Sequence, residues 1–315
     1  MSIPIDPELV PALELMAARS AGVAMPARGD AVGLREMVDM ALAAMHEQRP
    51  DAPEVSLREF AAVAEDGASI PMRWYQPAAD PPGSAIVYAH GGGMVAGTLD
   101  NYDRLMRYYV QLTGVPFLAV DYRLAPEHRG PTAARDVLAA IRWMLQHAPE
   151  MSVDPTRIAL MGDSGGGGVG AGAAIAARDA GLDLAGQILI YPMLDDRNTV
   201  PDPTLEATAT WGYDNNFTGW SSAVGPKLGQ HGVDALTAPA RLQDFAGLAA
   251  AYIEVGDLDI FRDESVDYAR RLWAAGVACE LHVHSGAPHG FDWINSEAVV
   301  TRRALEDRAR VIRSF

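Results

Sequence analysis

A serine set among glycines, directly after a short apolar run, constrains the fold of this chain more than any other feature. The run Arg157–Leu160 is typical of a buried strand, and Met161–Gly168 continues it as Met-Gly-Asp-Ser-Gly-Gly-Gly-Gly. The alanine-rich segment Val169–Asp179 predicts a helix packed closely against a sheet. Strand, Gly-x-Ser-x-Gly turn and helix form a nucleophile elbow, in which side chains at Gly162 and Gly166 would collide with the neighbouring strand and helix. The alternatives are a plain glycine-rich turn or a phosphate loop, but a Walker loop needs a lysine after its glycines, and none is present here.

A second glycine cluster, His90–Gly93, follows the predicted strand Ala85–Ala89. Acyl transfer builds negative charge on a carbonyl oxygen, and backbone N–H groups directed at that oxygen stabilise it. Consecutive glycines let the backbone turn its amides toward such a site, whereas the simpler interpretation is again a glycine-rich turn. We expect an oxyanion hole formed by the amides of Gly92, Gly93 and Gly165.

The general base for a serine nucleophile should be a histidine on a loop after the last predicted strand. Among the eight histidines, His289 has that position, because it follows a Ser-Gly-Ala-Pro loop and precedes Gly-Phe. His282 and His284 lie two apart inside a predicted strand and therefore point to one face, which indicates partly buried structural residues. We interpret His90 and His128 as residues that stabilise turns.

Three carboxylates compete to orient the histidine, since Asp257, Asp259 and Asp263 all follow the seventh predicted strand. Asp263 precedes a glutamate at the expected start of a helix, where acidic residues are favoured, so its role should be structural. We choose Asp259 as the triad acid, with Asp257 as the alternative. The order Ser164, Asp259, His289 is then the hydrolase order of nucleophile, acid and base.

The order of the predicted elements indicates an α/β protein. Two alternating runs are typical of an antiparallel hairpin, and six apolar strands then alternate with helices. This pattern predicts an eight-stranded, mostly parallel, doubly wound sheet with helices on both faces. In such a sheet, sites form beyond the carboxyl ends of the strands, where the motifs above lie. The expected strands are residues 54–63, 68–76, 85–89, 117–120, 158–161, 187–191, 249–255 and 279–284, and helices are expected at 133–147 and 263–275.

Two segments without strands are expected to form a helical cap on a catalytic domain of residues 51–315. The first is residues 1–50, with helices predicted at 8–19 and 30–48, and the second is an insertion at about 196–242. The helix at 30–48 carries an apolar stripe with helical spacing: Leu34, Met37, Val38, Ala41, Leu42 and Met45. The simpler interpretation of this stripe is core. The alternative is that part of it lines a substrate cavity, where flexible thioethers adapt to apolar groups.

The formal net charge of −16 argues against binding to nucleic acid or to anionic membranes. No run reaches the ~18 apolar residues of a membrane span, and no basic segment followed by an apolar one predicts a signal peptide, so we expect no membrane insertion. Cys279 is the only cysteine, which favours a reducing, cytoplasmic compartment. Because Cys279 lies in a predicted strand, we expect a core residue.

The chain resembles the hormone-sensitive-lipase family of α/β-hydrolase fold esterases along nearly its whole length after residue 80. The resemblance rests on His90-Gly91-Gly92-Gly93, Asp121–His128, Gly162-Asp163-Ser164-Gly165-Gly166, Tyr191-Pro192, Asp259–Glu264 and His289-Gly290-Phe291. Asp163 is similar to the branch with aspartate before the serine, and the family pattern Asp-Pro-Leu-Arg-Asp-Glu implies Asp259 as the acid. The stretch 121–128 is expected to brace the oxyanion loop.

One residue and one pair of residues depart from the family pattern. Gly165 stands where the family usually has alanine, which keeps the amide donor and is expected to loosen the turn. Ile260-Phe261 replaces Pro-Leu and is expected to leave the acid loop less rigid. Neither departure removes a reacting atom.

These features predict a serine carboxylesterase with no metal or organic cofactor, whose partner is a small-molecule ester. Ser164 would attack the ester carbonyl while His289 takes its proton, and water would then release the acyl-enzyme. An amidase or peptidase with the same triad is one alternative. A small-molecule receptor is another, since gibberellin receptors resemble the family but lack the catalytic histidine. We expect short chains, about C4 to C8, because no large apolar lid surface is indicated; the oligomeric state stays open, with a homodimer as one possibility.

Overall fold

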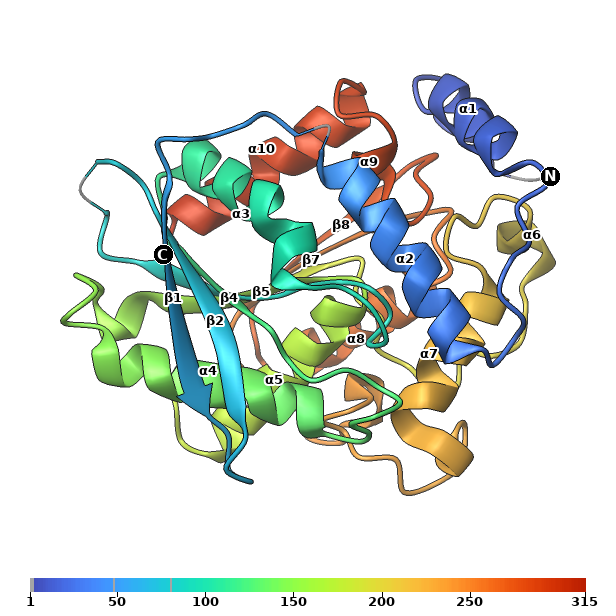
Figure 1. The fold of residues 1–315 in the computed structure, drawn as a ribbon. Coiled ribbons are helices and arrows are strands. Elements are labelled where there is room, and N and C mark those ends of the chain that lie inside the picture. The colour runs from blue at the N-terminus through green and yellow to red at the C-terminus, as the bar shows by residue number, and fades with distance from the viewer. Residues whose placement is uncertain (1–2, 48, 80) are drawn as a thin grey trace.

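A computed structural model of the chain describes residues 3–47, 49–79 and 81–315. One eight-stranded sheet runs through the molecule in the order β1-β2-β4-β3-β5-β6-β7-β8 (Figure 1). Its strands are β1 (Ser56–Val63), β2 (Ser69–Gln76), β3 (Ala85–Ala89), β4 (Phe117–Val120), β5 (Ile158–Asp163), β6 (Gln187–Ile190), β7 (Ala251–Gly256) and β8 (Cys279–His284). β1 pairs with β2 and β2 with β4 in antiparallel fashion, and all other pairs are parallel. The predicted eight-stranded, mostly parallel α/β-hydrolase fold is confirmed.

Helices cover both faces of this sheet. In Figure 1, α3 and α10 lie on one face and α4, α5 and α8 on the other. The larger helices of the body are α3 (Leu99–Thr113), α4 (Thr132–His147), α5 (Gly165–Asp179), α8 (Arg262–Ala274) and α10 (Val299–Arg313), with the short α9 (Phe291–Ile294) before α10. Short 3-10 turns occupy Pro155–Arg157, Gly225–Lys227 and Pro239–Arg241. Two large groups of buried apolar side chains fill the two spaces between the sheet and its helices.

Local sequence explains where these elements lie. All residues of β3 and β5 are buried, which fits parallel strands covered on both faces. α3 begins after Thr98, whose hydroxyl accepts a hydrogen bond from the amide of Asn101 at 3.1 Å, and ends at Gly114 with φ 73°. In the parallel register, Ala89 of β3 lies opposite Gly162 of β5, so the two glycine motifs leave the sheet side by side.

Four helices lie to the side of the sheet, beyond the strands that carry the motifs (Figure 1): α1 (Val10–Ser20), α2 (Ala31–His46), α6 (Pro203–Glu206) and α7 (Tyr213–Val224). They fall in the two segments expected to lack strands, and within the described part of those segments no strand is present. Residues 1, 2 and 48 of the predicted first segment lie outside the described residues. α1 has no buried residue, whereas Leu34 of α2 is buried in the core.

The prediction that Cys279 is a core residue is only partly right. β8 is the edge strand of the sheet, so Cys279 is half-buried. Burial raises the pKa of its thiol to about 12, which leaves it protonated at neutral pH. Its behaviour is that of a small apolar residue at the edge of the core.

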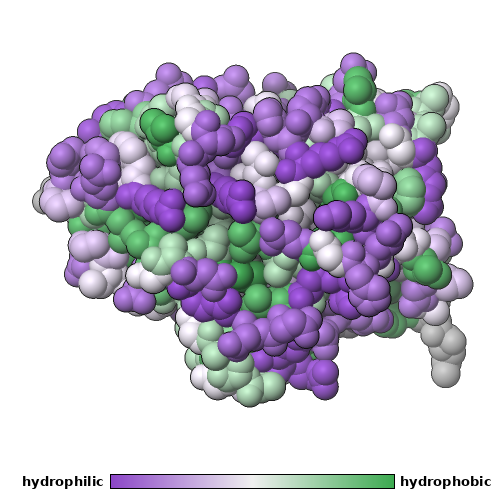
Figure 2. All heavy atoms as spheres, turned by 90° about the horizontal axis from the view of Figure 1, so that it is seen from below, coloured by the Kyte–Doolittle hydropathy of each residue, from purple (hydrophilic) through white to green (hydrophobic). Residues whose placement is uncertain are grey.

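The face of the molecule seen in Figure 2 is mainly hydrophilic. Figure 2 shows one face, with charged and polar side chains around a partly hollowed band of hydrophobic ones. Among the described residues, no helix is both long and apolar enough to cross a membrane.

Candidate active site

Ser164 stands at the tight turn between β5 and α5. Its backbone has φ 53°, an uncommon value for a residue with a side chain, and its amide donates to the carbonyl of Ile190 at 2.9 Å. A Cβ on Gly166 would lie 2.2 Å from the carbonyl oxygens of both Ala89 and His90. The elbow therefore packs directly on the end of β3, and the serine side chain is directed away from the sheet toward a histidine.

The structure brings the three predicted triad residues together. The Oγ of Ser164 lies 2.9 Å from Nε2 of His289, and Nδ1 of His289 lies 2.7 Å from Oδ2 of Asp259. Asp259 is fully buried, and its other oxygen accepts a hydrogen bond from the amide of Phe261 at 2.9 Å. One carboxylate oxygen of Asp259 is therefore hydrogen-bonded to the imidazole, and the other is hydrogen-bonded to the backbone. The histidine is therefore oriented with one nitrogen toward the serine.

The two competing carboxylates have other partners. Asp257 accepts a hydrogen bond from the amide of Gly286 at 2.7 Å, so it joins the acid loop to the histidine loop. Asp263 lies in the first turn of α8 and forms an exposed ion pair with Arg262 at 2.7 Å. Neither side chain contacts the imidazole in this arrangement.

The amides of Gly92, Gly93 and Gly165 have no hydrogen-bond partner among the described residues. Gly92 has φ 117°, a conformation that side chains disfavour, and a Cβ there would lie 2.3 Å from the carbonyl of Ala96. Gly165 begins α5, whose N-terminal dipole favours negative charge beside Ser164. These unpartnered amides are suited to stabilise an oxyanion formed next to the serine.

The oxyanion loop fills the space beside Gly165. A Cβ on Gly165 would lie 2.7 Å from the amide nitrogens of both Gly93 and Met94. The expectation that glycine loosens the turn is therefore not what the packing indicates. The missing methyl lets the loop approach the elbow closely.

Asp163 connects the two glycine motifs. Its buried carboxylate accepts hydrogen bonds from the hydroxyl of Tyr88 at 2.6 Å, the hydroxyl of Tyr102 at 2.9 Å and the amide of Gly91 at 3.0 Å. Burial raises the pKa of Asp163, while the two tyrosine hydrogen bonds oppose that rise. The residue before the nucleophile thus holds the oxyanion loop against the elbow.

The stretch 121–128 packs against the oxyanion loop, as expected. The hydroxyl of Tyr122 donates to the carbonyl of His90 at 2.6 Å, and the two rings are stacked with centroids 4.3 Å apart. The amide of Ala125 donates to the carbonyl of Met94 at 2.9 Å. Burial lowers the pKa of His90 to about 4, so its ring is neutral at pH 7. The ring contributes to packing against Tyr122.

The helix α2 is docked on the same loop, a feature that the sequence analysis missed. Arg35 donates hydrogen bonds to the carbonyls of Val95 at 2.5 Å and Ala125 at 2.8 Å, and pairs with Glu127 at 2.7 Å. Asp39 accepts a hydrogen bond from the amide of Gly97 at 2.8 Å. The sequence does contain a signal for this contact, since Arg35 and Asp39 are four residues apart and so lie on one face of the helix.

A buried ionic cluster supports the histidine from behind. Tyr191, with φ 35°, packs its ring on edge against His289 at 4.8 Å and donates its hydroxyl to Asp292 at 2.9 Å. Arg308 of α10 bonds both Asp292, at 2.6 Å, and Glu254 of β7. Burial opposes the ionised carboxyl, but the charge of Arg308 holds the pKa of Asp292 below its ordinary value. No local pattern in the sequence distinguishes Arg308 from a surface arginine.

An apolar pocket of about 310 Å³ opens onto the serine. The predicted catalytic domain contributes Gly92, Ser164, Tyr191 and His289 to its lining. The two segments expected to form a cap contribute Met16, Met25, Met37, Val38, Ala41, Leu42, Met45 and Trp211. Apart from Leu34, the stripe of α2 therefore lines the cavity, which favours the second interpretation of its methionines. Such a lining accepts apolar groups of varied shape.

One cluster among the described residues has the spacing of a metal site. Glu280, His282 and Asp307 offer ligand atoms that lie within 4.8 Å of one another. Arg310 forms ion pairs with both carboxylates of this cluster. Because a guanidinium already pairs with both carboxylates and exposed acidic groups commonly gather without an ion, the cluster carries no argument for a metal.

Known proteins match this chain along most of its length. The family described as alpha/beta hydrolase fold matches residues 86–292. Ethyl acetate hydrolase of Pseudomonas putida is 34% identical over 305 residues, 91% of this chain and 92% of that protein. Carboxylesterase NlhH of Mycobacterium tuberculosis is 36% identical over 258 residues, 80% of each. The solved structure of a bacterial heroin esterase is similar with a TM-score of 0.87 and 32% identity, covering 98% of this chain and 97% of that one.

Proposed function

The chain belongs to the α/β-hydrolase fold family, as a hormone-sensitive-lipase-like carboxylic ester hydrolase, and from this premise we propose that it cleaves short- to medium-chain esters through an acyl-enzyme on Ser164. One observation carries the proposal. It is the unbroken chain of contacts from Ser164 to His289 at 2.9 Å and from His289 to Asp259 at 2.7 Å. Unpartnered amides of the oxyanion loop lie beside that serine.

The proposed cycle has two halves. Ser164 attacks the ester carbonyl and gives its proton to Nε2 of His289, while the amides of Gly92, Gly93 and Gly165 stabilise the oxyanion. His289 then protonates the leaving alcohol, and the C–O bond to that alcohol breaks. In the second half, His289 takes a proton from water, which attacks the acyl-enzyme, and the acid leaves as Ser164 regains its proton. Asp259 stabilises the imidazolium that forms in each half.

The size of the pocket supports the proposed chain length. Its volume of about 310 Å³ is at the lower end of the roughly 300–1,000 Å³ typical of ligand sites. The name of one relative, ethyl acetate hydrolase, refers to a small ester. We also propose that residues 1–50 and 196–242 act as the cap, because α1, α2 and Trp211 contribute to this pocket.

The setting of the enzyme is a further part of the proposal. A single cysteine favours a reducing, cytoplasmic compartment. A homodimer is proposed as an assembly state, and light scattering of the purified chain at several concentrations measures it. A mass of 33.6 kDa at all concentrations would contradict the dimer.

The central test uses p-nitrophenyl esters from acetate to palmitate. We expect the largest kcat/KM between butyrate and octanoate, a burst of nitrophenol in the first turnover where deacylation limits the rate, and loss of both in Ser164→Ala. Matched anilides of the same acids separate an esterase from an amidase with the same triad. Highest activity on emulsified long-chain triglyceride would contradict the chain-length proposal, and a fully active Ser164→Ala would contradict the acyl-enzyme.

A further inference from the structure

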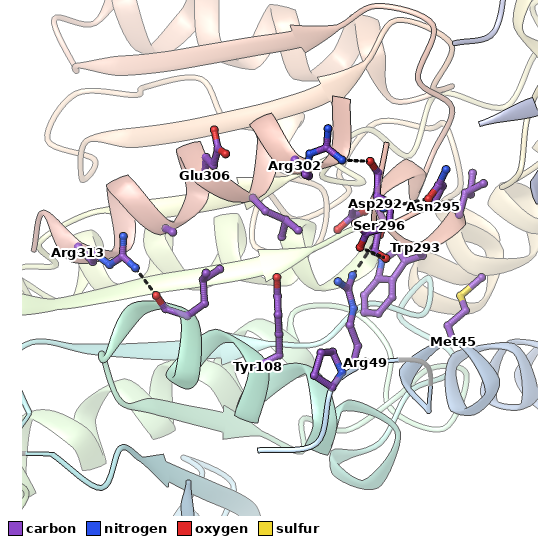
Figure 3. Close-up of a pocket in the computed structure, with 16 residues that line it drawn as sticks. Met45, Arg49, Tyr108, Asp292, Trp293, Asn295, Ser296, Arg302, Glu306 and Arg313 are labelled. Atoms are coloured by element: carbon purple, nitrogen blue, oxygen red, sulfur yellow. Dashed lines mark hydrogen bonds between the residues drawn. The ribbon is translucent and has the colours of Figure 1, made fainter. Parts of the chain in front are cut away.

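Two hollows of the molecule meet at one wall. The catalytic pocket, of about 310 Å³, contains Ser164, and a groove of about 650 Å³ lies beside α10 (Figure 3). Met45, Trp293 and Ile294 line both hollows. These three side chains therefore separate the pocket from the groove.

Trp293 is the fixed member of the wall. Its indole Nε1 donates a hydrogen bond of 2.9 Å to the hydroxyl of Tyr191, and its ring makes an edge contact with Tyr102 at 6.5 Å between centroids. From the groove side, the guanidinium of Arg49 lies over the ring, 4.9 Å from its centroid (Figure 3). A ring held on both sides does not move aside for a substrate, whereas a methionine such as Met45 changes rotamer readily.

The environment changes from apolar to charged at this wall. On the pocket side, the lining includes the apolar side chains of α2. On the groove side, Arg49 is only 7% exposed, and its guanidinium also donates to the carbonyl of Asp292 at 3.2 Å. An aliphatic chain that passed the wall would have to take water or hydrogen bonds away from that guanidinium, which is costly.

We propose that Trp293 is a specificity-determining residue that ends the apolar part of the catalytic pocket and sets the longest aliphatic ester chain the enzyme accepts. The inference rests on the proposed function, since it concerns the substrate of the same serine. The inference names Trp293 as the residue that limits the length of the ester chain, and the groove beside α10 as the space behind that residue. Removal of the indole joins the pocket to the groove.

The experiment compares chain-length profiles. In Trp293→Ala, the ratio of kcat/KM for p-nitrophenyl decanoate to that for the butyrate should rise by about tenfold or more, since each methylene newly admitted to an apolar pocket is worth roughly tenfold. Trp293→Phe keeps a ring in the wall and loses only the N–H, so its ratio should stay within about threefold of wild type. Leu112→Ala is the matched control, because Leu112 lines the groove but not the wall. A second series of alkyl acetates, ethyl to octyl, followed by acid release, shows which side of the ester meets the wall.

A rise of the ratio in either series for Trp293→Ala, with Leu112→Ala unchanged, supports the inference and assigns the wall to the acyl or the alcohol chain. Unchanged ratios in both series for a folded Trp293→Ala overturn it. If circular dichroism shows that this variant does not fold, Ile294→Ala shortens the same wall, and its unchanged ratios overturn the inference in the same way. If the wild type is active through Ser164 but the kcat/KM ratios of Trp293→Ala are unchanged, only the role of Trp293 is refuted. If the wild type is inactive on every ester, the proposed function and this inference are refuted together.

Discussion

The two walls of the catalytic pocket are built in different ways. Apart from Trp293 and Ile294 of α9, the wall formed by the hydrolase body is built around polar groups at the ends of β3, β5, β7 and β8, joined by buried hydrogen bonds such as those of Asp163 and Asp259. The wall formed by the cap consists of apolar side chains, and α1 has no buried residue at all. Groups that must be placed within tenths of an ångström are on the rigid side, and groups that only exclude water are on the looser side. The difference indicates that chemistry and substrate choice respond to separate changes.

The largest effect is expected on the body wall. Asp259→Asn keeps the shape of the acid but can favour the wrong imidazole tautomer, so kcat should fall by up to about 10⁴. Thermal stability should change little. The measurement is single-ester kinetics together with a melting curve.

Two matched variants serve as controls for the acid. Asp257→Asn should lose far less activity, because its carboxylate bonds the amide of Gly286 and not the imidazole. Asp263→Asn should have a small effect, since asparagine is also accepted near a helix start. If Asp257→Asn is crippled while Asp259→Asn stays active, the triad acid is wrongly assigned.

A smaller loss is expected when the oxyanion loop is pushed away from the elbow. Gly165→Ala adds a methyl 2.7 Å from the amides of Gly93 and Met94, so the loop must shift. Since loss of one oxyanion donor costs about 10²–10³ in kcat, a shifted loop should cost about tenfold to a hundredfold. Gly170→Ala is the control on the same helix, because its nearest neighbour would be a leucine atom at 3.8 Å. Equal kcat in both variants would show that the loop accommodates the methyl freely.

Arg35 tests the junction between the two walls. Arg35→Met removes the hydrogen bonds to Val95 and Ala125 while keeping most of the side-chain length. Because the contact holds the oxyanion loop from the cap side, kcat should fall by about tenfold on every ester, without a change in chain-length preference. Arg28→Met, which removes an exposed ion pair with Asp214 of α7, should leave kcat unchanged. A changed preference with normal kcat would place Arg35 in the cap wall instead.

The smallest effect is expected on α1. Met16→Ala enlarges the pocket from the cap side and should shift the ratio of octanoate to butyrate activity by about twofold to threefold, with kcat for butyrate unchanged. Leu15→Ala is the control, because Leu15 is 51% exposed and does not line the pocket. Identical profiles for the two variants would show that α1 lies too far from the substrate to matter.

The sequence predicts the body wall well because its signals are local. Each candidate residue follows a predicted strand directly, and parallel strands end at one edge, so Ser164, Asp259 and His289 could be grouped without knowledge of side-chain positions. The assignments of these residues to their roles stay predictions until the variants are measured. Cys279 shows the limit of such reasoning, because a strand can be recognised before its place at the edge of the sheet is known.

The cap wall could not be predicted in the same way. Helical spacing places Met37, Leu42 and Met45 on one face, but the same pattern suits a face turned to the core and a face turned to a cavity. The partners of Arg35 and Asp39 lie about sixty to ninety residues further along the chain. Contacts at such separations depend on how the whole chain folds. The role of Arg308 could not be predicted for the same reason, since its partners come from β7 and α9.

The carboxylate of Asp163 has a consequence for how the enzyme fails under heat. Because this one side chain holds Gly91 of the oxyanion loop and sits next to the nucleophile, neither motif can open locally without breaking the bonds of the other. Segments tied together in this way exchange their amide hydrogens as one cooperative unit. We therefore expect the nucleophile and its oxyanion donors to be lost together, when the sheet itself unfolds. Because α1 has no buried residue, we expect it to fray at lower temperature, so that a warmed enzyme becomes less selective before it becomes inactive.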